Sequence, residues 1–120
     1  MEMKKMHIVP HSHWDREWYM SFSKHRYRLV KFMDTLIDIL EADMNFKHFH
    51  LDGQIVPIED YLEIRPEQRD RIIKLVKNGK LKIGPWYVLQ DEFLIGGEAN
   101  IRNLLYGLKE SHKYGNPTMI

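Results

Sequence analysis

The sequence predicts an α/β fold in which parallel strands are flanked by helices. Strand-like and helix-like patterns alternate in the order β-α-β-α-α-β-α along the 120 residues. Helical segments separate the predicted strands, and a helical crossover of this kind makes successive strands parallel. Three parallel strands form an incomplete sheet, because such sheets need both faces covered and closed barrels need more strands. We therefore expect a truncated portion of a larger α/β domain, without an internal boundary.

The predicted strands are short apolar runs bounded by turn residues. They are Lys4 to Val9, Phe46 to Leu51, and Lys80 to Gly84. The pair Asp52-Gly53 is a turn signal after the second run, and Pro85 marks an end or a bend of the third, which would otherwise reach Val88. The last residues, 116–120, are expected to lead into a fourth strand.

Four helices are predicted between and after these strands. They span Lys24 to Asp43, Gln54 to Ile64, Pro66 to Asn78, and Glu98 to Tyr114. The first and the last carry apolar residues at three-four spacing, which makes one apolar face. Pro57 is tolerated only in the first turn of the second helix. Gly79 and Gly115 are expected to end the third and the fourth.

The composition excludes several classes of protein. The formal net charge is +1 without a long basic run, so neither nucleic acid nor an anionic membrane is an expected partner. The chain has no cysteine, which excludes disulfides and thiolate metal sites. No run resembles a secretory signal or a membrane span. These features predict a soluble, cytoplasmic protein.

The best candidate site lies where the three predicted strands end. Ligands of parallel α/β folds bind outside the carboxyl ends of the strands, and each of these ends is rich in polar residues. After the first strand, His13 and Asp15 are two residues apart, so they project to one side of an extended chain, as does His11. Imidazole and carboxylate are the usual zinc ligands when thiolate is absent. The stretch would supply two or three ligands, although surface loop residues explain the pattern about equally well.

The remaining polar and aromatic candidates carry open alternatives. Trp14 and Trp18 are either core aromatics, which the pattern alone favours, or platforms for a sugar ring. His48 and His50 resemble a second metal motif, but we interpret them as packed, hydrogen-bonded residues. Asp52 either caps the following helix or shapes the pocket.

Asp91 and Glu92 form a pair of carboxylates after the third strand. Paired carboxylates are typical of glycoside hydrolysis. Adjacent residues of an extended chain point in opposite directions, however, so we expect only one of them to face the site.

Three motifs together resemble one known family. The stretches PHSHWDREWY, HLDGQ and GPWYVLQDEFLIGGEANIRNLLYG, in this order, are similar to the N-terminal part of bacterial family 38 glycoside hydrolases, the α-mannosidases. The resemblance covers nearly the whole chain. It implies a retaining, zinc-dependent enzyme that hydrolyses terminal α-mannosides on a barrel-like domain of the seven-stranded β/α type.

The resemblance also implies roles for individual residues. His13 and Asp15 match two ligands of a single zinc ion, and His11 matches a motif histidine that supports the ligands without touching the metal. Trp18 matches the wall of the sugar subsite. Trp18, Asp15 and Asp91 are predicted to contact the α-mannoside.

Other parts of the family's site are expected beyond Ile120. These are the nucleophile, the acid/base carboxyl group and the remaining zinc ligands, so the chain alone would be inactive and would tend to self-associate. Three alternatives stay open: a mannosylglycerate hydrolase of the same family, a metal-dependent deacetylase or amidohydrolase-like domain, and a free-standing sugar-binding module.

Overall fold

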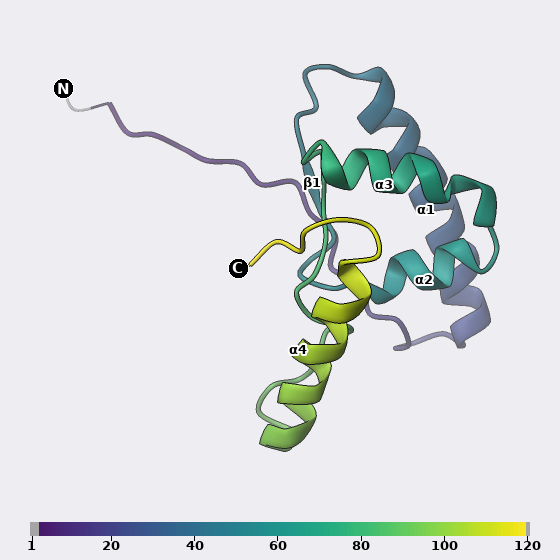
Figure 1. Cartoon of the computed structure of the whole chain (residues 1–120), viewed down its shortest axis with the longest axis vertical. Coiled ribbons are helices and arrows are strands. Elements are labelled where there is room, and N and C mark those ends of the chain that lie inside the picture. Colours follow the sequence, from purple (N-terminus) through teal and green to yellow (C-terminus); the bar gives the residue numbers. More distant parts are fainter. Residues whose placement is uncertain (1–2, 120) are drawn as a thin grey trace.

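The computed structural model describes residues 3–119. Helix α1 (Phe22–Ala42) precedes strand β1 (Phe49–His50), and helix α2 (Val56–Leu62), the short 3₁₀ helix η1 (Pro66–Gln68) and helix α3 (Arg69–Lys77) follow it. Strand β2 (Leu81–Lys82) then leads through a long loop to helix α4 (Gly97–Ser111). Figure 1 shows α1, α2 and α3 grouped on one side of the extended segments, with α4 at the lower end of the molecule.

The sheet is small and parallel. Strands β1 and β2 pair in register, with Phe49 opposite Leu81 and His50 opposite Lys82. An isolated parallel bridge pairs His11 with His50 on the other edge of β1, and a second, between Gln54 and Trp86, continues the pairing of the segments after β1 and β2. The parallel direction of the strands confirms the prediction. The pairing after β2 continues past Pro85 to Trp86 but does not reach Val88.

The first predicted strand is wrong in position. Residues 4–9 form no strand and extend away from the body of the molecule (Figure 1). Pairing begins only at the next residues, where the His50 N–H donates to the Pro10 carbonyl (3.0 Å) and the Ser12 N–H donates to the His50 carbonyl (3.2 Å). The apolar run has no neighbouring chain among residues 3–119, and a strand cannot form without one.

The other two strands are also shorter than predicted. Backbone bonds between them begin with the Phe49 N–H and the Lys80 carbonyl (2.8 Å) and end with the Leu51 N–H and the Lys82 carbonyl (3.0 Å). Beyond β2, the Thr118 N–H donates to the Ile83 carbonyl (2.8 Å). Residues 116–119 therefore approach the free edge of β2, as expected of a run-up to a fourth strand, although they form no strand; Ile120 lies outside the described residues.

Three of the predicted helices pack as their patterns indicate. Helix α1 buries the stripe of Leu29, Met33, Leu36, Ile37 and Leu40 against α2 and α3. Pro57 lies in the first turn of α2, and Gly79 follows α3 with a positive φ of 72°. The shared core joins these helices to the sheet. Its fully buried members include Met33, Ile37, Ile58, Tyr61, Ile72, Leu81 and Ile83.

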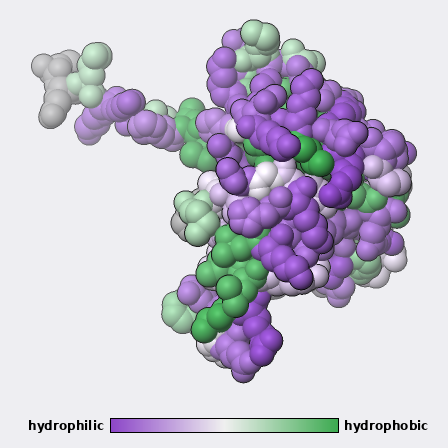
Figure 2. Space-filling model, viewed as in Figure 1, coloured by the Kyte–Doolittle hydropathy of each residue, from purple (hydrophilic) through white to green (hydrophobic). Residues whose placement is uncertain are grey.

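Helix α4 turns its predicted apolar face away from this core. Its buried residues are Gly107, Glu110 and Ser111, whereas Ile101 and Leu105 are 61% and 60% exposed. Gly107 lies so close to the preceding loop that a Cβ there would stand 2.2 Å from the Trp86 carbonyl carbon. Figure 2 shows the hydrophobic surface over the end of the molecule where α4 lies.

No helix within residues 3–119 combines the length and the apolar character that a membrane span needs.

Candidate functional site

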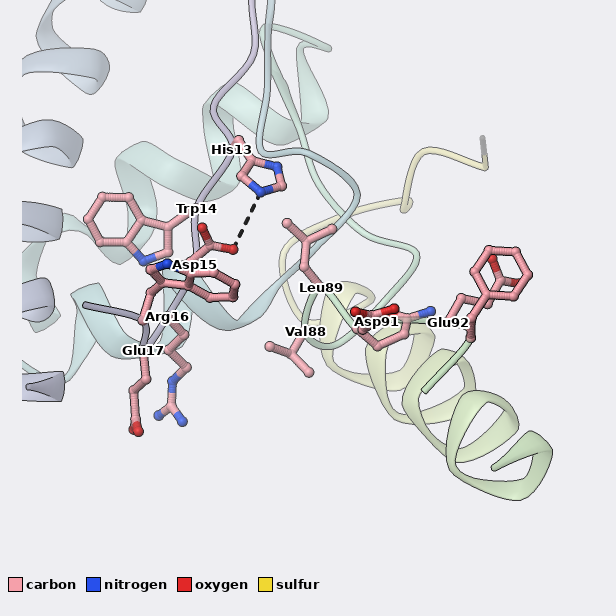
Figure 3. Close-up of a pocket in the computed structure, with 12 residues that line it drawn as sticks. His13, Trp14, Asp15, Arg16, Glu17, Val88, Leu89, Asp91 and Glu92 are labelled. Atoms are coloured by element: carbon pink, nitrogen blue, oxygen red, sulfur yellow. Dashed lines mark ion pairs between the residues drawn. The ribbon is translucent and has the colours of Figure 1, made fainter. Parts of the chain in front are cut away.

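An open cleft of about 740 Å³ lies at the carboxyl ends of the parallel segments. Residues 13–18, which follow the first paired segment, form one wall, and residues 88–93, which follow β2, form the other (Figure 3). The two segments are far apart in the sequence and meet at this rim because the chain segments before them run parallel, on opposite sides of β1. The sequence-based expectation that polar groups gather at this rim is thus confirmed in space.

Asp52 connects two of the predicted site histidines. Its Oδ1 lies 3.1 Å from His11 Nδ1, and its Oδ2 lies 3.0 Å from His13 Nδ1. The residue has a positive φ of 51° in the turn that follows β1. Asp52 does not cap α2, whose N-cap is Ile55 and has no side-chain cap bond. Of the two roles considered from the sequence, the structure therefore favours shaping the site.

His13 and Asp15 face one another on the first wall of the cleft. The distance from His13 Nε2 to Asp15 Oδ1 is 3.4 Å, and the His13 side chain is 68% exposed (Figure 3). This distance is longer than a charge-assisted hydrogen bond of about 2.7–2.9 Å. It is close to the separation of about 3.3 Å that two ligands have when each is about 2.0–2.1 Å from one tetrahedral zinc ion.

The donor set fits a divalent metal only in part. His13 Nε2 and Asp15 Oδ1 are suitable zinc donors, but His11 reaches Asp52 rather than Asp15. Within residues 3–119, no three His, Cys, Asp or Glu side chains are placed to share one ion. These residues can therefore provide two donors, and a complete site needs others.

The two tryptophans of the first motif have different surroundings. The Trp14 ring stacks on Phe32 at a centroid distance of 6.2 Å and meets His25 edge-on at 6.0 Å, which confirms a core role. Trp18 is 76% exposed and lines the cleft, so its interpretation as a core aromatic is wrong. A local pattern does not distinguish them, because each tryptophan's partners come from elsewhere in the chain.

Asp91 and Glu92 both line the opposite wall. In Figure 3 they lie beyond Val88 and Leu89 when viewed from Asp15. The expectation that only one of them faces the site assumed an extended chain, and that assumption is wrong. The segment is instead a turn, in which the Leu94 N–H donates to the Asp91 carbonyl (3.0 Å).

Two polar contacts that sequence reasoning missed hold the walls in place. Arg16 donates to both carboxylate oxygens of the buried Asp60 on α2, through Nε (2.7 Å) and Nη2 (2.8 Å). These hydrogen bonds raise the pKa of the Arg16 guanidinium above its ordinary value. The sequence gives one signal for this pair, which is an aspartate among the apolar residues of a short helix. That signal does not identify Arg16 as its partner.

Gln54 joins the two walls directly. Its side chain is fully buried, its Nε2 donates to the Trp14 carbonyl (2.9 Å), and its Oε1 accepts from the Leu89 N–H (3.4 Å). The predicted helix start at Gln54 is wrong, because the residue is paired with Trp86 in the sheet. The sequence signal for this joining role was a glutamine directly after a turn at the end of a strand.

The second histidine pair lies outside the cleft lining. His48 precedes β1 and is half-buried, whereas His50 is buried within it. Burial lowers the pKa of the His50 imidazole. The prediction that His50 is packed is confirmed, but the prediction that it is hydrogen-bonded is wrong for Nε2, which has no partner among the described residues.

Comparison with known proteins decides the family. The model of the glycosyl hydrolases family 38 N-terminal domain matches residues 3–116. The chain belongs to glycoside hydrolase family 38. A Halalkalibacterium halodurans protein provisionally named mannosylglycerate hydrolase is 54% identical over 112 residues, which are 93% of this chain and 12% of that protein. Alpha-mannosidase F of Dictyostelium discoideum is 29% identical over 109 residues, 88% of this chain and 11% of that protein.

Solved structures of the family share this fold. An alpha-mannosidase from Enterococcus faecalis superposes with a TM-score of 0.88 at 52% identity, over 92% of this chain and 12% of that one. A second family 38 protein from Enterococcus faecalis gives a TM-score of 0.84 at 47% identity, over 93% of this chain and 13% of that one. The family 38 chain thus spans about an eighth of the length of these relatives.

Proposed function

We propose that this chain is the N-terminal part of the catalytic domain of a retaining, zinc-dependent α-mannosidase that hydrolyses terminal α-mannosides. The observation that carries the proposal is the pair His13 and Asp15, which face one another in a cleft of a family 38 chain. The parallel segments would be the first strands of a barrel-like β/α domain, and residues 1–120 would contain no domain boundary.

Each wall of the cleft has a role in this proposal. His13 Nε2 and Asp15 Oδ1 hold one Zn²⁺, which supplies a Lewis-acid contact for sugar hydroxyls when bound. The exposed Trp18 offers a flat indole face to the C–H groups of the mannose ring. Asp15 and Asp91 accept hydrogen bonds from sugar hydroxyls on opposite sides of the cleft.

The remaining reactive groups would come from the part of the protein beyond Ile120. Retaining hydrolysis needs a nucleophilic carboxylate and an acid/base carboxyl group about 5–5.5 Å apart. The two donors identified here also leave zinc without a full set of ligands. We therefore propose that the 120-residue chain is inactive by itself and contributes half of a shared site.

A second candidate function is hydrolysis of mannosylglycerate. It is favoured by the Halalkalibacterium halodurans relative provisionally named mannosylglycerate hydrolase, which is 54% identical to this chain. Both candidates cleave an α-mannosyl bond and would use the same two metal donors. The family match gives no support to the deacetylase or amidohydrolase-like alternative, or to a free-standing binding module.

The deciding experiment is an assay of the intact protein that contains this chain. An aryl α-mannoside and mannosylglycerate are offered separately and in competition, before and after treatment with a chelator and re-addition of zinc. We expect sugar release that the chelator abolishes and zinc restores, with the α-anomer formed first in NMR spectra. Release of acetate or ammonia without sugar cleavage would contradict the proposal, and the faster substrate selects between the two candidates.

A further inference from the structure

Among residues 3–119, Asp52 is the one acidic side chain that touches both histidines of the first motif. Each oxygen of its carboxylate faces a different imidazole, at 3.1 Å for His11 Nδ1 and 3.0 Å for His13 Nδ1. A carboxylate can only accept hydrogen bonds, so both Nδ1 atoms must donate. A neutral imidazole has a single N–H, and its other nitrogen then carries a free lone pair. For His13 this nitrogen is Nε2, the atom that faces Asp15 at 3.4 Å.

The Asp52 carboxylate is held more firmly than the His13 ring that it contacts. Asp52 lies between two backbone bonds to the neighbouring segment, from the Leu51 N–H to the Lys82 carbonyl (3.0 Å) and from the Trp86 N–H to the Gly53 carbonyl (2.9 Å). Its side chain is 25% exposed, whereas that of His13 is 68% exposed. Since little packs against the His13 ring, the bond to Asp52 is the contact that can set its orientation.

His11 completes the arrangement from the side of the sheet. The residue pairs with His50 in a parallel bridge, so its backbone is fixed beside β1. Its bond to Oδ1 leaves Oδ2 directed at His13. A carboxylate behind a histidine ligand commonly fixes the tautomer and the ring orientation, and it raises the basicity of the ligating nitrogen.

We propose that Asp52 is a positioning residue that holds His13 as the Nδ1–H tautomer, so that Nε2 is available to a divalent cation beside Asp15. In this arrangement His11 steadies the carboxylate and does not touch the cation. The metal-directed part of the inference rests on the proposed function, whereas the tautomer of His13 can be tested without metal.

The first test is NMR of the metal-free, ¹⁵N-labelled chain at pH 7.5. Long-range ¹H–¹⁵N correlations distinguish a protonated from an unprotonated imidazole nitrogen. We expect the neutral His13 ring to have a protonated Nδ1 and an unprotonated Nε2. A neutral ring with its proton on Nε2 would overturn the proposal. This result does not depend on any variant or on enzymatic activity.

The second test uses Asp52→Asn in the intact protein, with Asp70→Asn as the control. Asparagine tolerates the positive φ at this position, so the turn should survive. Asp70 is exposed in the first turn of α3, away from the cleft, and its substitution changes the charge equally. We expect Asp52→Asn to weaken zinc binding in calorimetry about 10- to 100-fold and Asp70→Asn to leave it unchanged.

The outcomes separate this inference from the proposed function. Equal zinc affinity of Asp52→Asn and the wild type would overturn the positioning role. An intact wild-type protein that binds no zinc would instead reject the metal of the proposed function, and with it the metal-directed part of this inference. If Asp52→Asn does not fold, the tautomer of wild-type His13 still decides.

Discussion

At the scale of single residues, the first motif contains a structural anchor beside the residues that we propose as metal donors and sugar contacts. Arg16 is an anchor, because its two bonds to the buried Asp60 tie the first wall of the cleft to α2. Hydrogen bonds to charged groups contribute about 1.5–3 kcal/mol each when a partner is removed. The partial exposure of Arg16 places this contact at the lower end of that range.

Arg16→Ala should therefore lower the free energy of unfolding by about 2 kcal/mol, because Asp60 would keep a buried charge without its partner. Urea denaturation measures the change. The matched control is Arg102→Ala, which removes an exposed pair with Glu98 on α4 and should cost about 0.5 kcal/mol or less. Equal costs for the two substitutions would show that the Arg16 bonds are not structurally important.

The two cleft tryptophans should respond in opposite ways to truncation. Trp14→Ala removes a ring stacked on Phe32 and should destabilise the chain by about 3 kcal/mol. Trp18→Ala should leave stability nearly unchanged, because the ring is 76% exposed, but should raise KM for an α-mannoside in the intact protein. Thermal denaturation and steady-state kinetics separate the effects. A large loss of stability in Trp18→Ala would contradict its assignment to the cleft wall.

These residues show what local sequence can predict. The residue types and their place in the order of elements indicate where His13 and Asp15 lie, but not that Trp18 is exposed. Local sequence did not predict three of the contacts. These are the hydrogen bonds of Asp52 to two histidines, the hydrogen bonds of Gln54 to both walls, and the Arg16–Asp60 pair. Each of these contacts joins residues about 35 to 44 positions apart in the chain, and a local pattern carries no information on such partners.

At the scale of elements, the helices were predicted better than the strands. The 3.6-residue period of α1 is visible within the helix itself and needs no partner to be recognised. The apolar run at residues 4–9 looked like a strand, but pairing depends on where another chain segment lies. The apolar stripe of α4 was identified correctly as a pattern. Its outward direction follows instead from the close approach of Gly107 to the loop after β2.

Gly107→Ala tests how α4 is held against the molecule. The added Cβ would stand 2.2 Å from the Trp86 carbonyl carbon and 2.3 Å from the Pro85 carbonyl oxygen, both of which are backbone atoms. We expect a loss of about 3 kcal/mol and faster amide exchange throughout α4. Gly97→Ala is the control, since nothing lies within 4 Å of its added Cβ. Similar behaviour of the two variants would contradict the packing described for α4.

At the scale of the whole molecule, the chain combines an open cleft and an exposed apolar surface with one small parallel sheet. Ile101 and Leu105 on α4 are exposed, as are Phe93 and Leu94 in the loop before it. Figure 2 shows hydrophobic surface over the end of the molecule where α4 lies. Contiguous apolar surface of this kind promotes association. The parallel direction and the rim position of the cleft followed from the order of elements.

Self-association of the isolated chain should therefore depend on the exposed face of α4. We expect sedimentation to show concentration-dependent oligomers for the wild-type chain and fewer for Leu105→Lys, because the added charge must be desolvated in a contact. Tyr27→Lys, on the exposed part of α1, controls for the loss of an unrelated exposed hydrophobic residue. A monomeric wild-type chain at all concentrations would contradict this expectation.

The central proposal is that His13 is a zinc donor in the site of an α-mannosidase. It is tested most directly by comparing His13→Ala with His48→Ala in the intact protein, measuring kcat/KM on an α-mannoside together with zinc content. His48 is half-buried and lies outside the cleft lining, so it controls for the loss of a histidine. We predict that His13→Ala loses zinc and about 100-fold or more in kcat/KM, while His48→Ala retains both. Wild-type zinc content and activity in His13→Ala would contradict the claim.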